Sequence, residues 1–259
     1  MKSLHKIFFS LFFRVLSSTV FFYVLFFLFF ELSSYLNWVS PALIPAPHQL
    51  IDLFFSPESP LLEPLIKTAL YSMMAFILSS LIALVLGLLI HRFNYLKKII
   101  TPLTLFFQTV PIIAMAPLLV IYIGFGAWTI LSAALIVCFF PVLSATLIGL
   151  NQINVLEEEL FLFYEASELQ KILKLKIPSA LPTLQAGLRT SAGLSVVGVV
   201  SGEFVAGGGL GGLIDSARLQ QRVDLVFAAL ILLSLIGLFL MKITEFLFQI
   251  FFKKYLKRS

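Results

Sequence analysis

The sequence predicts an all-α membrane protein with six transmembrane helices. Hydrophobic residues make up 60% of its 259 residues and charged residues only 12%, and the mean hydropathy is +1.04. Soluble domains carry roughly 25% charged residues, so this chain falls outside their range. Because each helical crossing takes about 20 residues plus a connection, the chain has room for about five to seven spans. That leaves no length for a sizeable catalytic domain outside the membrane.

The first two predicted spans lie at about 15–36 and 65–90, after an N-terminal segment, 1–14. The first apolar run ends without a small-residue cleavage site, so we interpret it as a retained span rather than a signal peptide. The loop that follows it, 37–63, contains five prolines and no lysine or arginine. Its segment HQLIDLFF favours a short interfacial helix. Serines and a glycine in the second span allow close helix packing in lipid.

Prolines interrupt the third predicted span, about 103–123, at Pro111 and Pro117. A proline removes one helical hydrogen bond, and such breaks survive in a membrane where protein or a watery cavity satisfies the freed carbonyls. We therefore expect a kink toward a translocation path, although a kink that serves only packing is an equal alternative. Two glycines in the sequence GFG predict a tight turn into the fourth span, about 128–147.

Small residues dominate the fifth predicted span, about 186–205, which suits a helix that faces other helices. Glu203 and the run AGGGLGGLI follow. No Gly-Lys-Ser/Thr comes after this run and no strand precedes it, so a flexible turn or re-entrant segment is favoured over a phosphate-binding loop. The sixth span is predicted at about 225–249, with a basic tail at 250–259.

The distribution of lysine and arginine predicts the orientation. With a cytoplasmic N-terminus, 15 of the 18 basic residues fall on the cytoplasmic side, and the other three are Lys67, Arg218 and Arg222. The positive-inside rule therefore favours an even number of spans with both termini in the cytoplasm. The net charge of +5 is then a topology signal, and no nucleic-acid partner is expected.

A cytoplasmic loop, 148–185, contains the only long polar interruption of the chain, Glu157 to Pro182. Its acids come first and its lysines last, the order that complements a helix dipole. Apolar residues recur at helical spacing, which predicts that part of the segment is an amphipathic helix that the two prolines end or kink. The residues at this spacing are Leu162, Leu169, Ile172 and Leu173, and the prolines are Pro178 and Pro182. Such a helix either rests on lipid or seats in a soluble partner.

This polar stretch resembles the cytoplasmic EAA loop of bacterial ABC importer permeases, whose pattern is Glu-Ala-Ala, three residues, Gly, nine residues, then Ile-x-Leu-Pro. Starting at Glu159, the spacing places Glu165 at the glycine position and Pro178 at the proline. Leu160 and Phe161 replace both alanines. Three further stretches, PIIAMAPLLVIYIGFG, IPSALPTLQAGLR and GEFVAGGGLGGLI, resemble the nitrate/sulfonate/taurine-type permeases. The resemblance covers roughly residues 40 to 250.

The resemblance implies a type I ABC importer permease fold in a multi-pass subunit of the bacterial inner membrane. Such a subunit pairs with a second copy, receives solute from an extracytoplasmic binding protein and couples to a cytoplasmic ABC ATPase dimer. The chain has no Walker motif, so partner subunits would use the ATP and no cofactor is expected in this chain. The residues that the resemblance assigns to ATPase coupling are Glu159, Glu165, Ala166, Ser167, Leu169 and Pro178. Because Glu165 replaces a glycine that permits a turn, we expect either a compensating basic residue on the ATPase or a different docking mode.

Two other classes of function are weaker alternatives. A membrane-embedded enzyme would need catalytic side chains at membrane depth, and Glu31, Glu203 and Lys242 are scattered without a His or Asp partner. A scaffold would leave the proline-broken third span unexplained. No catalytic residue and no metal site is therefore predicted. Candidates for lining a translocation path are Gln108, Thr109, Pro111, Pro117, Tyr122, Ser201 and Glu203, each of which could equally hydrogen-bond a neighbouring helix. A sulfonate, nitrate, pyrimidine or vitamin precursor all remain possible solutes.

Overall fold

The computed structural model describes residues 19–256 except 37, 39, 41 and 42. Every regular element in this part of the chain is a helix. The chain divides into two compact units, of which the first is Met1–Pro60 with Ser216–Ala228 and the second is Leu61–Asp215 with Ala229–Ser259. The predicted N-terminal segment 1–14, the start of the first span and residues 257–259 of the basic tail lie outside the described residues.

The first unit contains helix α2, Thr19–Tyr35, and helix α3, Pro47–Phe55. Helix α3 coincides with the short helix predicted from HQLIDLFF. Glu31 of α2 contacts His48 of α3, with 2.7 Å between Oε1 and Nδ1. This contact ties the two helices together across the proline-rich loop, so the expectation that Glu31 has no histidine partner was wrong.

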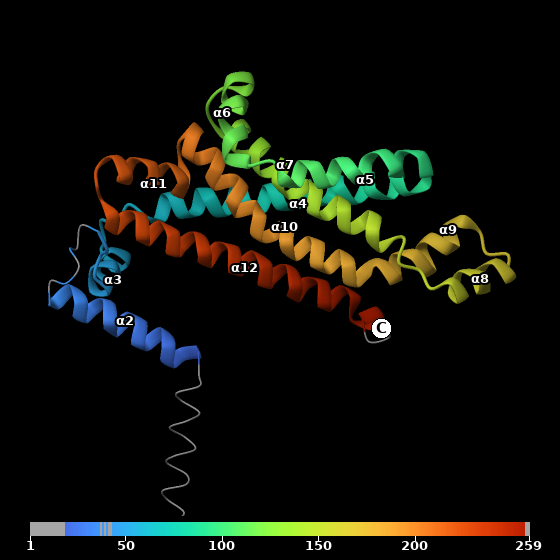
Figure 1. The fold of residues 1–259 in the computed structure, drawn as a ribbon, viewed down its shortest axis with the longest axis horizontal. Coiled ribbons are helices and arrows are strands. Elements are labelled where there is room, and N and C mark those ends of the chain that lie inside the picture. The colour runs from blue at the N-terminus through green and yellow to red at the C-terminus, as the bar shows by residue number, and fades with distance from the viewer. Residues whose placement is uncertain (1–18, 37, 39, 41–42, 257–259) are drawn as a thin grey trace, which may run out of the picture. The chain divides into compact units, whose positions relative to one another are not determined.

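Four long helices occur in the rest of the chain: α4 (Leu62–Arg92), α7 (Ala127–Gly149), α10 (Ile177–Ala206) and α12 (Val223–Leu256). Within the second unit, α4, α7 and α10 lie side by side (Figure 1). Between them come α5 (Asn94–Thr109), α6 (Ile112–Ile123), α8 (Val155–Phe163), α9 (Glu168–Lys171), a π-helix (Ile172–Lys176) and α11 (Gly209–Leu219).

Three of these helices are long and apolar enough to cross a membrane alone: Leu62–Arg92, Ala127–Gly149 and Val223–Phe252. Two bent pairs raise the number in the described residues to as many as five, if each pair is one span. One pair, Tyr95–Thr109 with Ile112–Ile123, bends by 98°, and the other, Glu168–Ala206 with Gly209–Leu219, bends by 51°. The six-span topology and the orientation of the termini stay predictions.

Close backbone approach holds α10 against α7, as the small residues of the fifth predicted span suggested. A Cβ atom added to Gly198 would lie 2.6 Å from the Cα of Ala134, and one added to Gly202 would lie 2.7 Å from the Cα of Ile130. Both distances are shorter than side chains tolerate, so glycine is required for this contact. The small residues of α10 therefore serve helix packing.

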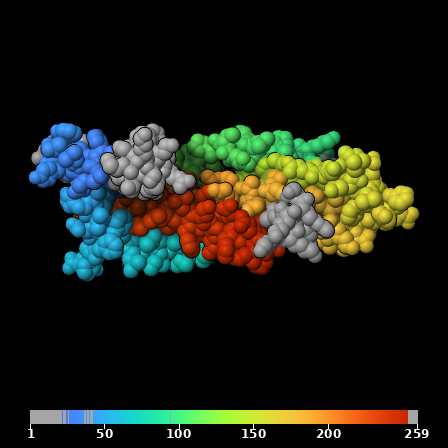
Figure 2. All heavy atoms as spheres, turned by 90° about the horizontal axis from the view of Figure 1, so that it is seen from below, coloured from blue at the N-terminus to red at the C-terminus, as the bar shows by residue number. Residues whose placement is uncertain are grey.

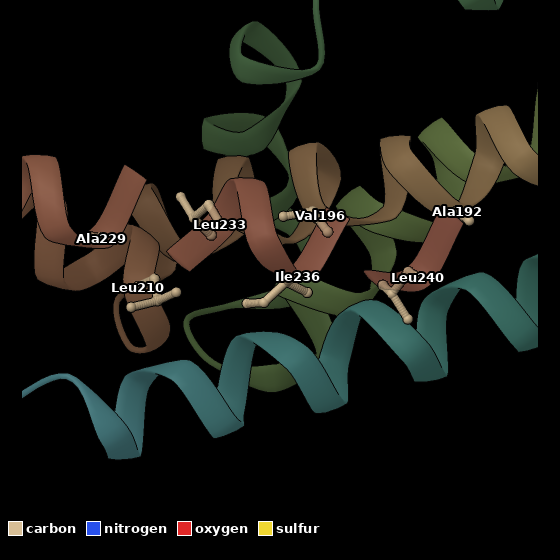
Figure 3. Packing of buried hydrophobic residues seen from close by; sticks show 7 residues of the cluster. All are labelled: Ala192, Val196, Leu210, Ala229, Leu233, Ile236 and Leu240. Carbon is tan, nitrogen blue, oxygen red and sulfur yellow. The ribbon is translucent and has the colours of Figure 1, made fainter. Parts of the chain in front are cut away.

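A buried apolar cluster joins α10, α11 and α12 above α4 (Figure 3). Its members are Ala192, Val196, Leu210, Ala229, Leu233, Ile236 and Leu240. Partly buried residues of α4, including Leu65 and Phe76, pack against it. Because lipid is as apolar as these side chains, close packing rather than transfer from water stabilises the cluster.

Several details of the helix predictions were wrong. Pro117 does not interrupt a helix, because α6 continues through it to Ile123 and loses only one hydrogen bond. Of the predicted end or kink at Pro178 and Pro182, the end is contradicted, because α10 begins at Ile177 and runs through both. Helix α10 contains the predicted span 186–205 and nine residues before it.

Candidate functional site

The polar stretch begins with two short helices, α8 and α9, that are joined by a turn. Asn154 caps α8, since its side chain accepts a hydrogen bond from the Leu156 N–H at 3.0 Å. Glu157 and Glu158 lie in the first turn of α8, where acids complement the helix dipole. Glu159 follows them and is exposed. Leu162 belongs to α8, whereas Leu169, Ile172 and Leu173 lie in the continuous helical run Glu168–Ala206.

Glu165 makes the turn between the two helices. Its φ is 49°, in the left-handed region that glycine usually occupies. The Glu165 N–H donates to the Leu162 carbonyl at 2.9 Å, and the Ala166 N–H donates to the Phe161 carbonyl at 3.0 Å. These two bonds form a Schellman motif, in which the left-handed residue directly follows the C-cap. The position that holds glycine in the EAA pattern is therefore a turn here too, contrary to the expectation that glutamate would not permit one.

Ser167 begins α9 through a capping box. Its hydroxyl accepts from the Gln170 N–H at 3.3 Å, and the Gln170 side chain accepts from the Ser167 N–H at 3.0 Å. Lys171 Nζ lies 3.0 Å from Glu168 Oε1, and this hydrogen bond lowers the pKa of the Glu168 carboxyl. Both helices of the loop thus begin at defined caps although they are short.

A π-helical turn connects α9 to α10. The Ile177 N–H donates to the Ile172 carbonyl, five residues back. This wider turn accommodates Pro178, whose ring would meet the carbonyl four residues before it in an α-helix. Lys176 Nζ lies 3.2 Å from His91 Nε2, and Leu175 is buried. The start of α10 is thereby attached to the end of α4.

The outer surface of the α8–α9 loop carries large apolar side chains among its acids. Those exposed by more than half of their area are Val155, Leu156, Leu160, Leu162, Phe163, Tyr164, Leu169 and Leu173. The rings of Phe163 and Tyr164 meet edge to face with centroids 5.8 Å apart. Figure 2 shows the loop in yellow as a protruding surface at one end of the second unit.

The predicted path residues fall in three places. Gln108 and Thr109 end α5, and Pro111 directly precedes α6, so these three surround the 98° bend. Tyr122, in the last turn of α6, is 83% exposed. The bend confirms the predicted kink at Pro111. Pro117 lies within α6 and away from the break.

Ser201 and Glu203 lie near the C-terminal end of α10, and both are buried. The Ser201 hydroxyl donates to the Val197 carbonyl of its own helix. Glu203 accepts hydrogen bonds from Thr68 Oγ1 at 2.8 Å and from the Gly211 N–H at 2.9 Å. Thr68 also accepts from the Leu210 N–H at 2.8 Å. This network holds the glycine-rich turn, where three successive glycines have positive φ, against α4.

Sequence reasoning missed Thr68 and Asn154. Thr68 is fully buried and lies 135 residues from Glu203, so no local pattern connects the two. Asn154 could have been found, because an Asn three residues before a glutamate is a typical N-cap pattern.

The comparisons with known proteins agree with this architecture. A model of the family described as binding-protein-dependent transport system inner membrane component matches residues 79–257. The chain belongs to this family, and it is an inner-membrane permease component of an ABC importer.

Individual relatives support the same assignment. A probable ABC transporter permease protein of Haemophilus influenzae is 30% identical over 76% of this chain and 80% of its own length. The formylaminopyrimidine transport permease ThiX of Halalkalibacterium halodurans is 34% identical over the same shares. The taurine transport permease TauC of Escherichia coli is 25% identical over 79% of this chain and 78% of its own.

A solved structure shares the fold. The inward-facing methionine ABC transporter MetNI matches with a TM-score of 0.60 and 17% identity, over 71% of this chain and 94% of that one. The part of the chain that this match covers thus has the fold of a chain of that transporter.

Proposed function

We propose that this chain is one half of the transmembrane pathway of a bacterial inner-membrane importer, with six spans and both termini in the cytoplasm. A second copy supplies the other half, an extracytoplasmic binding protein delivers the solute, and a cytoplasmic ABC ATPase dimer supplies the energy. Family membership and the distribution of basic residues support this assembly. The relatives are transporter permease subunits, which favours transport over an enzymatic or scaffolding role.

The α8–α9 loop is the ATPase-docking element in this proposal. The observation that carries it is the exposed Schellman turn at Glu165, which stands at the glycine position of the EAA pattern. Exposed Phe163 and Tyr164 provide apolar area, Glu159 provides negative charge for a basic groove, and Glu165 provides the turn. Ala166 and Ser167 set the angle between the two helices, Leu169 adds apolar surface, and Pro178 limits where α10 begins.

The test measures solute uptake and ATP hydrolysis by the full complex in proteoliposomes. The binding protein is supplied inside or outside the vesicle. We expect Glu159→Ala and Ala166→Arg to abolish stimulation of ATP hydrolysis by the loaded binding protein and to stop uptake. Glu158→Ala, which removes the same charge one residue away, is the matched control. Normal uptake by both the Glu159 and Ala166 variants would overturn the docking assignment.

The solute is not indicated by family membership, because ThiX is named for a formylaminopyrimidine and TauC for taurine. ThiX is the more similar of the two, which favours a small heterocyclic solute over a sulfonate. Purifying the binding protein encoded with this chain and identifying its bound solute by mass spectrometry tests this directly. A sulfonate in that binding protein would contradict the preference.

A further inference from the structure

A cavity of about 300 Å³ lies at the break between α5 and α6, where these helices meet α7 and α10. Its volume is at the lower end of the range typical of small-molecule sites, about 300–1,000 Å³. Gln108 lines it from the last turn of α5, Met115 from α6, Phe140 from α7, and Thr190 and Leu194 from α10. Four helices thus converge on one site near the strongest bend in the described chain.

The lining combines flat aromatic surface with a few polar groups. Phe107 and Phe140 stack with ring centroids 4.9 Å apart and planes within 6°. Gln108 makes no hydrogen bond to another described residue, so its amide can both donate and accept. The Thr190 hydroxyl donates to the Ala186 carbonyl at 3.0 Å and retains lone pairs that can accept.

None of the described residues that line the cavity is charged. A charged solute would find no oppositely charged side chain among these residues. An alkyl chain, in turn, would leave the Gln108 amide without a partner. A planar solute with hydrogen-bonding groups at its edge satisfies both the amide and the aromatic rings.

We propose that this cavity is a solute-binding site of the permease and that it selects an uncharged, planar heteroaromatic compound. The Gln108 amide pairs with the edge of the ring, Thr190 accepts a donor, and the Phe107–Phe140 pair contacts the face. The proposal rests on the proposed function, because only a transport path exposes such a site to solute.

The experiment measures equilibrium binding of radiolabelled cytosine to the permease in lipid nanodiscs, purified with its ATPase subunits. Cytosine is an uncharged heteroaromatic probe, and taurine is the charged comparison. We expect saturable cytosine binding that Gln108→Leu weakens about tenfold, because the variant removes the amide and keeps the volume. Phe140→Leu is expected to weaken it by about three- to tenfold. Gln220→Leu, the same change at an exposed residue outside the cavity, is the control.

The outcomes separate this inference from the proposed function. Loss of ATPase co-purification from the unaltered permease would overturn the proposed function. With co-purification intact, the absence of saturable cytosine binding would overturn the inference and indicate that lipid fills the cavity. Tighter binding of taurine, or equal cytosine binding by the Gln108→Leu and Gln220→Leu variants, would overturn it as well. Gln108→Glu provides a second variant, expected to lose binding because it places a charge in the cavity.

Discussion

Two regions of this molecule place different demands on glycine. At the α7–α10 contact, Gly198 and Gly202 are needed for space, because an added Cβ atom would meet the backbone of the facing helix. At the α8–α9 turn, the EAA pattern has glycine for its backbone angle, and here Glu165 adopts that angle with its side chain exposed. A glycine required for space cannot be replaced, whereas one required for φ can be replaced at a modest energetic cost.

The largest expected effect is at the packed contact. Gly198→Ala places a methyl group 2.6 Å from the Cα of Ala134, and the backbone of α7 cannot move away freely. We expect a loss of about 3 kcal/mol, the upper end of overpacking effects. Thermal unfolding of the purified permease in detergent measures it. Gly237→Ala is the control, because the nearest atom to its added Cβ, Val196 Cγ2, lies 4.0 Å away. Equal melting temperatures for the Gly198→Ala and Gly237→Ala variants would contradict the requirement for space at Gly198.

The buried network at Glu203 is expected to show the next largest effect. Thr68→Val removes the hydroxyl that donates to the Glu203 carboxylate and accepts from the Leu210 N–H, leaving both buried groups short of a partner. A loss of about 2 kcal/mol follows from such unsatisfied groups. The same melting experiment applies. Thr244→Val is the matched control, because this buried hydroxyl bonds only the Leu240 carbonyl of its own helix.

Replacing Glu165, whose φ lies in the left-handed region, is expected to stabilise the α8–α9 turn slightly. A non-glycine residue with left-handed backbone angles costs roughly 1–2 kcal/mol of stability. Glycine avoids this cost but loses about 0.5–1 kcal/mol through the larger entropy of its unfolded state. Glu165→Gly should therefore stabilise the loop by about 0.5–1 kcal/mol and preserve uptake. Hydrogen exchange of the Ala166 amide reports local stability better than global melting. Tyr164→Gly, at a residue with φ of −82°, is expected to speed exchange instead. Faster exchange in Glu165→Gly would contradict the strain assigned to this residue.

The smallest effect is expected at the exposed ion pair of the loop. Glu168 and Lys171 are neighbours on α9, and the Glu168 side chain is 60% exposed. Solvent screens such pairs, so Glu168→Gln should leave the melting temperature unchanged within error. A measurable drop would show that the loop is held more tightly to the core than its exposure indicates.

The break in the third predicted span could be predicted only in part from the sequence. Pro111 and Pro117 are the same residue type in the same apolar run, yet only Pro111 lies at a bend. Pro111 precedes the first residue of α6, where a missing N–H has no helical partner to lose. Local sequence rules treat both prolines as breakers, and the surrounding packing decides between them.

For the polar stretch, the sequence predicted the position but not the local structure. The residues showed where it lies in the chain, its acid-to-lysine order and its resemblance to the EAA loop. They did not show that it divides into two helices. Leu162 and Leu169 fit one helical period, and the turn at Glu165 carries no glycine to indicate it. Two backbone hydrogen bonds of the Schellman motif make that turn, and periodicity does not report them.

The sequence by itself determined the membrane class, the approximate position of each long helix and the family. These properties follow from the length and composition of apolar runs and from motif spacing, which are local. Only the tertiary structure decided which glycines need space, that Thr68 is the partner of Glu203, and that Gln108 faces a cavity. Those contacts join residues distant along the chain, and they depend on how neighbouring helices approach one another.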